Sequence, residues 1–144
     1  MAERATLTGD QSLRLLSLVS HTVTQRIEDA LKVHGSDIDQ WRILGLLVER
    51  GACPMNVIAE HAMLLAPKLS KVVDRMVSAN LVLRRPDAHD RRRVLVAASP
   101  RGQRAFAEWD AATAQVQQRF HAALGDEAPH LQTLLTRLHE SLTD

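Results

Sequence analysis

Apolar and polar residues recur along most of the chain with the spacing of amphipathic α-helices. In the first such segment, from Asp10 to about His34, apolar side chains return every three or four residues, which predicts a long helix. Residues 1–9 show no such period, and we expect them to form a loose arm. Gly35 follows the helix at a position where a left-handed residue often ends one. The pattern therefore predicts a long first helix that ends near Gly35.

Three shorter helical patterns come next. We expect them to run from Asp37 to Gly51, from Pro54 to about Ala62, and from Ala66-Pro67 to Ala79-Asn80. Asp37 with Gln40 three residues later resembles a capping box. The last of these helices has an apolar stripe that we expect to be buried: Leu65, Leu69, Val72, Val73 and Met76. Lys68, Lys71 and Arg75 lie on another face of it.

The rest of the chain, residues 81–144, predicts a hairpin followed by two helices. Two β-prone runs, 81–85 and 93–97, flank a polar loop that contains Pro86 and Asp87, as in a β-hairpin. Ser99-Pro100 is typical of a helix start, and this fifth helix is expected to end near Leu124, before Gly125. The last helix carries a leucine seam like that of a coiled coil: Leu131, Leu135, Leu138 and Leu142. Five or six helices with one inserted β-hairpin are expected.

Length and composition exclude several classes of protein. A chain of 144 residues with 45% hydrophobic residues is long enough for one domain with its own core. No apolar run reaches the roughly 18–20 residues of a membrane span, and the N-terminus lacks the apolar region of a secretory signal. We therefore expect a cytoplasmic protein that does not enter membranes. A single cysteine, Cys53, can form neither an internal disulfide nor, alone, a zinc site.

Positive charge is concentrated in one part of the chain. The formal net charge is only +1, yet ten basic and three acidic residues lie between Lys68 and Arg104, and the rest is net acidic. Such polarisation predicts one face that binds a polyanion. Tyrosine is absent and there are two Phe and two Trp, which disfavours a protein that stacks on unpaired bases. Double-stranded DNA is the expected partner.

The order of these elements is that of a winged helix-turn-helix. Its second helix would present Lys68, Ser70, Lys71 and Arg75, and such a helix fits the major groove of B-DNA. The hairpin tip, Asp90 to Arg93, is suited to placing an arginine in the minor groove. Asp90 precedes Arg92 by two residues and can hold its guanidinium by a charge-assisted hydrogen bond. The competing interpretation is a basic face that is simply solvated.

The stretch from Asp37 to Gly102 resembles the multiple-antibiotic-resistance regulator (MarR) family of winged-helix transcription factors. The resemblance is carried by the second to fourth helices, by the wing and by the start of the fifth helix: Gln40-Trp41-Arg42-Ile43-Leu44, Val57-Ile58-Ala59, Leu69-Ser70-Lys71-Val72-Val73-Asp74-Arg75-Met76, Leu81-Val82-Leu83-Arg84-Arg85-Pro86, Asp90-Arg91-Arg92 and Ser99-Pro100-Arg101-Gly102. The wing and the last of these motifs are the most specific. Asn80 and Ala98-Ser99 depart from the family's usual Gly and Leu-Thr, but neither change threatens the fold.

The resemblance implies a mainly α fold: a winged helix-turn-helix with long N- and C-terminal dimerisation helices and one β-hairpin wing. Residues 1–144 would form a single domain, with dimerisation helices at 10–35 and 100–144 and a DNA-binding lobe at 37–98. It also implies a homodimer on a pseudo-palindromic operator, and a repressor that a small molecule releases. The residues expected to contact DNA are Pro67, Lys68, Ser70, Lys71, Arg75, Asp90, Arg91 and Arg92.

An effector site is the less defined part of the interpretation. The first helix carries polar residues at helical spacing: Arg14, Ser17, His21, Thr24 and Glu28. Arg14 suits a carboxylate, His21 suits a phenol or second oxygen, and Trp41 supplies an aromatic wall. An aromatic carboxylate or its thioester is the ligand we expect. The alternative is that this series is the solvent-facing side of the helix.

Other functions have weaker support in the sequence. A redox-responsive regulator would have to use Cys53, whose simpler interpretation is a small residue in a turn. The seven histidines are scattered, so no metal site is expected. Gly-rich phosphate loops and nucleophile elbows are absent, so we expect no enzymatic activity and no cofactor. A dimeric interaction module or architectural DNA-binding protein without an effector stays open.

Overall fold

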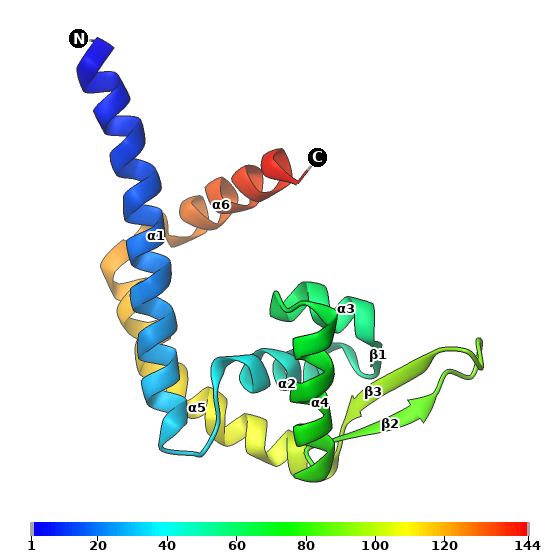
Figure 1. The fold of residues 1–144 in the computed structure, drawn as a ribbon. Coiled ribbons are helices and arrows are strands. Elements are labelled where there is room, and N and C mark those ends of the chain that lie inside the picture. Colours follow the sequence, from blue (N-terminus) through cyan, green and yellow to red (C-terminus); the bar gives the residue numbers. More distant parts are fainter. Residues whose placement is uncertain (1, 144) are drawn as a thin grey trace. The chain divides into compact units, whose positions relative to one another are not determined.

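The computed structural model describes residues 2–143, and the side-chain surroundings of residues 11–143. Its elements are α1 (Ala2–Lys32), α2 (Ile38–Arg50), β1 (Cys53–Pro54), α3 (Met55–Ala62), α4 (Ala66–Ser78), β2 (Val82–Pro86), β3 (Val94–Ala98), α5 (Pro100–Leu124), the 3-10 helix η1 (Gly125–Glu127) and α6 (Ala128–Leu142) (Figure 1). Two compact units meet within α5, one ending at Thr113 and one beginning at Ala114. The expected mainly helical winged fold is confirmed.

Helix α1 begins earlier than its hydrophobic period indicates. The prediction of a loose arm at residues 1–9 is wrong, because the helix already runs from Ala2. Alanine, glutamate, arginine and leucine in this segment favour helix intrinsically, so the helix continues where no apolar face exists. Its other end is as expected, with Gly35 in the left-handed region at φ +69°. Ile27 and Leu31, near this end, pack in the core.

Two carboxylates fix the start of α2. The Asp37 side chain accepts a hydrogen bond from the Gln40 backbone N–H at 2.9 Å, which confirms the predicted cap. The Gln40 side chain bonds back to the Asp37 carboxylate at 3.3 Å. From α1, Glu28 accepts a hydrogen bond from the Ile38 N–H at 3.1 Å. The first turn of α2 is thus held both by its own cap and by the preceding helix.

The hairpin belongs to a three-stranded antiparallel sheet of order β1-β3-β2. Strands β2 and β3 each lie one residue later than predicted, with Arg84 opposite Val96. The sequence did not predict β1, in which Cys53 pairs with Val96, because a two-residue strand has no readable period. This third strand joins the base of the hairpin to the start of α3.

The core of the first unit lies among α2, α3, α4 and the sheet. Its fully buried side chains include Leu44, Ile58, Leu69, Val72, Val73, Met76 and Val96. Four of the five residues predicted for the buried stripe of α4 are therefore in the core. The fifth, Leu65, is 82% exposed, so its predicted burial is wrong. It lies at the N-cap of α4, one residue before the helix, where the helical period no longer directs a side chain inward.

Helix α5 begins in tight contact with the start of β2. The Ser99 hydroxyl accepts a hydrogen bond from the Gly102 N–H at 2.9 Å and bonds to the Leu81 carbonyl at 3.1 Å, which confirms the predicted helix start. A Cβ on Gly102 would lie 1.9 Å from that carbonyl oxygen, so no side chain fits there. This contact fixes the direction in which α5 leaves the sheet.

The second unit contains the end of α5, η1 and α6. Within α6, residues 128–142, no side chain is buried, and Leu135, Leu138 and Leu142 of the leucine seam are all exposed. In α1, Leu13, Leu16 and Val19 are exposed as well. Over residues 2–143 we find no helix with the length and apolar character needed to cross a membrane.

Candidate DNA-binding surface and effector pocket

Helix α4 presents a polar side opposite its buried stripe. The residues that the sequence assigns to DNA contact here are all exposed: Pro67, Lys68, Ser70, Lys71 and Arg75. Burial of Leu69, Val72 and Met76 fixes which side of the helix turns outward. The structure therefore brings these five residues to one accessible side of a single helix.

Two ion pairs connect α4 to its neighbours. Lys68 Nζ lies 3.8 Å from a carboxylate oxygen of Asp39 in the first turn of α2, with the lysine side chain 67% exposed. Asp74 on α4 forms a salt bridge with Arg84 on β2. The first pair is long and exposed, and so contributes little to stability. The second, which is also exposed, links the hairpin to the helix beside it.

The tip of the hairpin is built from two aspartate turns. Asp87 accepts a hydrogen bond from the His89 backbone N–H at 2.9 Å, and Asp90 accepts one from the Arg92 backbone N–H at 3.0 Å. The prediction that Asp90 holds the Arg92 guanidinium is thus corrected, because the carboxylate contacts the main chain. A short carboxylate readily closes such a turn with the amide two residues on. Asp90, Arg91 and Arg92 are all exposed at this tip.

Arg93 has a structural contact that the sequence did not predict. Its guanidinium donates a hydrogen bond to the Asn56 side chain on α3 at 3.3 Å. The two residues are 37 positions apart, and neither belongs to a motif that would pair them. With Arg84 bound to Asp74, two of the arginines in the basic segment hold the hairpin in place. Arg91 and Arg92 are the exposed cations at the tip of the hairpin.

A pocket of about 210 Å³ lies beside Trp41. It is lined by Trp41, Arg42, Gly45, Glu49, His61 and Phe106, from α2, α3 and α5. The sequence identified Trp41 but missed the other five. Trp41, Gly45 and Glu49 are four residues apart, so the sequence indicates that they share one face of a helix. The predicted Arg14, Ser17 and His21 are exposed on α1 and are not among the lining residues.

Gly45 makes room for this pocket. A Cβ at Gly45 would lie 3.2 Å from the Phe106 ring, so the absent side chain allows α5 to approach α2 closely. The indole N–H of Trp41 is buried and has no hydrogen-bond partner among the residues that the structure describes. An unpaired buried donor of this kind costs free energy. Two aromatic rings, the Arg42 and His61 side chains and the Glu49 carboxylate thus line one pocket.

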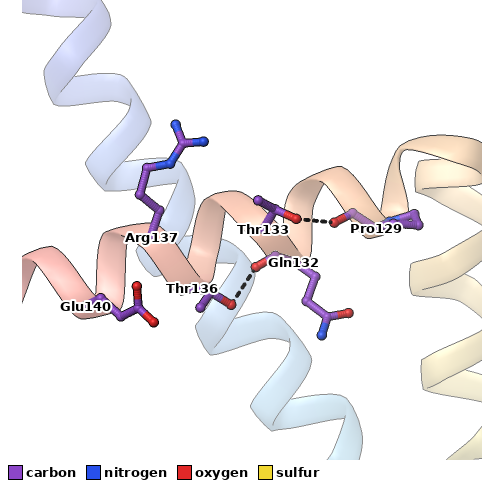
Figure 2. A pocket seen from close by; sticks show the side chains of 6 residues that line it. All are labelled: Pro129, Gln132, Thr133, Thr136, Arg137 and Glu140. Carbon is purple, nitrogen blue, oxygen red and sulfur yellow. Dashed lines mark hydrogen bonds between the residues drawn. The ribbon is translucent and has the colours of Figure 1, made fainter.

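A second hollow lies along one side of α6 (Figure 2). It is lined by Pro129, Gln132, Thr133, Thr136, Arg137 and Glu140, all from this one helix. Figure 2 shows that the Thr133 and Thr136 hydroxyls bond to backbone carbonyls four residues earlier, at 3.1 and 2.8 Å. Because one helix cannot surround a ligand and these hydroxyls are engaged, we do not assign a site here.

The sulfur of Cys53 is enclosed rather than presented to solvent. The residue is 5% exposed, and its thiol lies 3.4 Å from the Gly51 carbonyl. Reactive cysteines are at least partly exposed, whereas this thiol is enclosed. No group of three or more His, Cys, Asp or Glu side chains suited to a metal ion occurs in the part of the chain that the structure describes.

Comparisons with known proteins agree with this geometry. The model of the MarR family matches residues 38–94. The homoprotocatechuate degradative operon repressor of Escherichia coli is 30% identical over 105 residues, covering 70% of this chain and 71% of that protein. The transcriptional regulator FarR of Neisseria gonorrhoeae is 35% identical over 69 residues, covering 48% of this chain and 47% of FarR, so the match spans about half of that relative.

A solved structure extends the likeness. The crystal structure of NadR in complex with 4-hydroxyphenylacetate has a TM-score of 0.77 and 26% identity, covering 85% of this chain and 88% of NadR. The match to the repressor includes more than two thirds of each chain, and the family model covers the helix-turn-helix and the hairpin up to the first residue of β3. The chain therefore belongs to the MarR family of winged-helix, DNA-binding transcriptional regulators.

Proposed function

We propose that this regulator is a repressor that binds a pseudo-palindromic operator as a homodimer and leaves it when a small ligand binds. The observation that carries the proposal is the exposed basic side of α4, held beside the hairpin by the Asp74–Arg84 salt bridge. A helix and a hairpin fixed relative to each other can read a major groove and the neighbouring minor groove together. The repressor name of the Escherichia coli relative supports the direction of regulation.

In this proposal α4 lies in the major groove. Pro67, Lys68, Ser70 and Lys71 face bases or phosphates, and Arg75 contacts the backbone at the other end of the helix. Arg91 and Arg92 reach the minor groove from the hairpin tip, on a main chain that Asp90 holds in shape. Narrow minor grooves in AT-rich DNA attract arginine because their negative potential is enhanced. Sequence preference is thus expected on both sides of the major-groove contact.

Exposed apolar side chains support the homodimer. Leucine and valine side chains face solvent on α1, and leucines do so on α6. Burial of apolar surface is worth roughly 25 cal/mol per Å², so a second copy that covers these faces gains substantial free energy. We assign dimerisation to residues 10–35 and 100–144 and DNA binding to residues 37–98, within a single domain spanning 1–144.

For the effector we propose an aromatic carboxylate in the Trp41 pocket. Trp41 and Phe106 offer aromatic walls, and Arg42 offers a cation for the carboxylate. The ligand in the NadR structure, 4-hydroxyphenylacetate, has this chemistry. Arg14, Ser17 and His21 are the second candidate set, and variants can separate the two. The proposal includes a cytoplasmic location and no catalytic activity, since release of DNA needs neither covalent chemistry nor a cofactor.

The experiment that tests the function is selection of genomic DNA fragments by the purified protein, followed by affinity measurements over a salt series. We expect one palindromic site with nanomolar affinity and a salt dependence set by the number of phosphate contacts. Addition of 4-hydroxyphenylacetate or benzoate should then lower the affinity, with cyclohexanecarboxylate as a non-aromatic control. Weak binding that ignores sequence would reject the repressor and favour an architectural role.

A further inference from the structure

Leu65 occupies the N-cap of α4, where a polar residue is usual. Ser, Thr, Asp or Asn at this position accepts a hydrogen bond from the first amides of the helix, and leucine cannot. The structure shows no side-chain cap there, and the leucine side chain is 82% exposed. Met63, two residues earlier, is 69% exposed with φ +57°. Two large apolar side chains thus reach solvent in the turn that leads into the recognition helix.

Leu65 contributes neither to the packing of the core nor to the capping of the helix. Its side chain lies outside the buried stripe of α4, and a serine in its place would cap the helix. Single exposed apolar residues are ordinary on proteins, but this one continues into exposed Ala66 and Pro67 and then into the cationic side of α4. The apolar group therefore lies at the edge of the surface assigned to DNA.

We propose that Leu65 contacts thymine 5-methyl groups in the major groove and so determines part of the operator sequence. The inference rests on the proposed DNA binding of α4. The thymine methyl is the apolar group that the major groove presents, and apolar side chains recognise it by contact. Leu65 lies directly before the first turn of α4 and is continuous with exposed Ala66 and Pro67, so it would enter the major groove together with the start of this helix.

The basic residues that follow this apolar turn indicate which kind of partner contacts it. The exposed residues that follow it on α4 include Lys68, Lys71 and Arg75, and the one exposed acid of the helix, Asp74, is paired with Arg84. A polyanion that also carries methyl groups in an accessible groove is double-stranded DNA. RNA lacks the thymine methyl, and its major groove is too deep and narrow for a helix. An apolar protein partner would gain nothing from the adjoining cations.

The first part of the test changes the DNA. The duplex that the wild-type protein selects from a random library is resynthesised with deoxyuridine at one thymine at a time, which removes a single methyl group. We expect affinity to fall about fourfold at one or two positions, the value for loss of one buried methyl-sized group. Replacement at thymines outside the half-sites provides the matched control and should have no effect.

The second part changes the protein. Leu65→Ser restores an N-cap, so its midpoint of thermal unfolding should rise, and a loss of binding cannot be attributed to unfolding. Its affinity for the thymine duplex should fall to that of the wild type on the deoxyuridine duplex, with no further effect of deoxyuridine. Its salt dependence should match the wild type, because no phosphate contact is lost. Val48→Ser, at an exposed residue near the end of α2 that is assigned to neither DNA contact nor dimerisation, is the control and should keep full methyl sensitivity.

The outcomes separate the two proposals. If the wild type selects no sequence, the proposed function itself fails. If it selects a sequence but no thymine methyl matters, or if Leu65→Ser keeps the methyl effect, then the role of Leu65 is wrong while DNA binding stands. A change in oligomeric state on Leu65→Ser, seen by sedimentation, would place this turn at a contact between copies and overturn the inference.

Discussion

The carboxylate of Asp90 accepts a hydrogen bond from the backbone N–H of Arg92 at 3.0 Å, so it shapes the main chain of the hairpin tip. The Arg93 N–H bonds to the Asp90 carbonyl at 3.0 Å and closes the same turn. An acidic residue in a surface proposed to bind DNA thus has a conformational reason to be there. The Asp90 carboxylate thus shapes the turn that carries Arg92 and does not pair with the Arg92 guanidinium.

This relationship predicts different results for two replacements of Asp90. Asp90→Asn keeps an oxygen that can accept the amide hydrogen bond and should keep DNA affinity within about twofold, since only a backbone-directed contact is involved. Asp90→Ala removes the contact, worth about 1 kcal/mol, and should weaken binding about fivefold. Fluorescence anisotropy with the selected duplex measures both. Equal losses in the two variants would favour a charge contact with the guanidinium instead.

Arg92→Ala should weaken binding about tenfold on half-sites with AT-rich flanks, because the minor-groove contact depends on groove width and potential. On GC-rich flanks the loss should be smaller, and thermal stability should hardly change, since the side chain is exposed. Anisotropy titrations with the two flanks give the comparison. A uniform loss on every flank would mean that Arg92 contacts phosphate only.

Gly102→Ala should destabilise the fold by about 3 kcal/mol, because overpacking against a backbone atom cannot be relieved by a rotamer change. The new Cβ would lie 1.9 Å from the Leu81 carbonyl oxygen. Gly45→Ala is the matched control within a helix, since its Cβ would meet only the Phe106 ring, at 3.2 Å. There we expect a change within about 1 kcal/mol, as improved helix propensity offsets the crowding. Chemical denaturation compares them, and similar losses would refute the close contact.

The effector proposal predicts that Arg42→Ala keeps DNA binding but loses most of the release by 4-hydroxyphenylacetate, because the ligand carboxylate loses its cation in the Trp41 pocket. Arg14→Ala tests the other candidate set. If the ligand binds beside Trp41 alone, this variant should respond to the ligand as the wild type does. Release assays on the selected duplex separate the sites, and a normal response in Arg42→Ala together with a lost response in Arg14→Ala would move the ligand to α1.

The dimer proposal predicts that Leu138→Glu yields monomers with at least tenfold weaker operator binding, because a charge in an apolar interface is not solvated. Thr133→Glu is the control on the same helix, at a residue on the side opposite the seam whose hydroxyl bonds to Pro129. Its oligomeric state should be that of the wild type. Sedimentation equilibrium gives the mass of both. A stable Leu138→Glu dimer would exclude the seam from the interface.

The sequence was sufficient for those features that depend on neighbouring residues. The Asp37 cap, the Ser99 cap and the buried stripe of α4 each follow from residues within one or two turns. Features that join distant segments were not predictable in this way. The Arg93–Asn56 contact and the lining of the Trp41 pocket bring together residues from separate elements, and no local period encodes them.

Two local errors have a different origin. The helix over residues 2–9 was missed because hydrophobic period was the criterion, whereas a helix without an apolar face depends on intrinsic propensity. Leu65 was assigned to the core because its spacing from Leu69 fits the stripe. Helical spacing predicts the direction of a side chain only where the backbone is already helical. Leu65 has extended backbone angles of φ −72° and ψ 152°.

The close contact between Gly102 and Leu81 packs the first turn of α5 directly against the residue that precedes β2. The Ser99 hydroxyl bonds to the Leu81 carbonyl across this contact. No side chain at Gly102 separates the helix from the strand. Phe106 lies one turn further along α5, in the wall of the Trp41 pocket. The Phe106 wall of the pocket and the start of β2 are therefore separated by only one turn of helix and one close backbone contact.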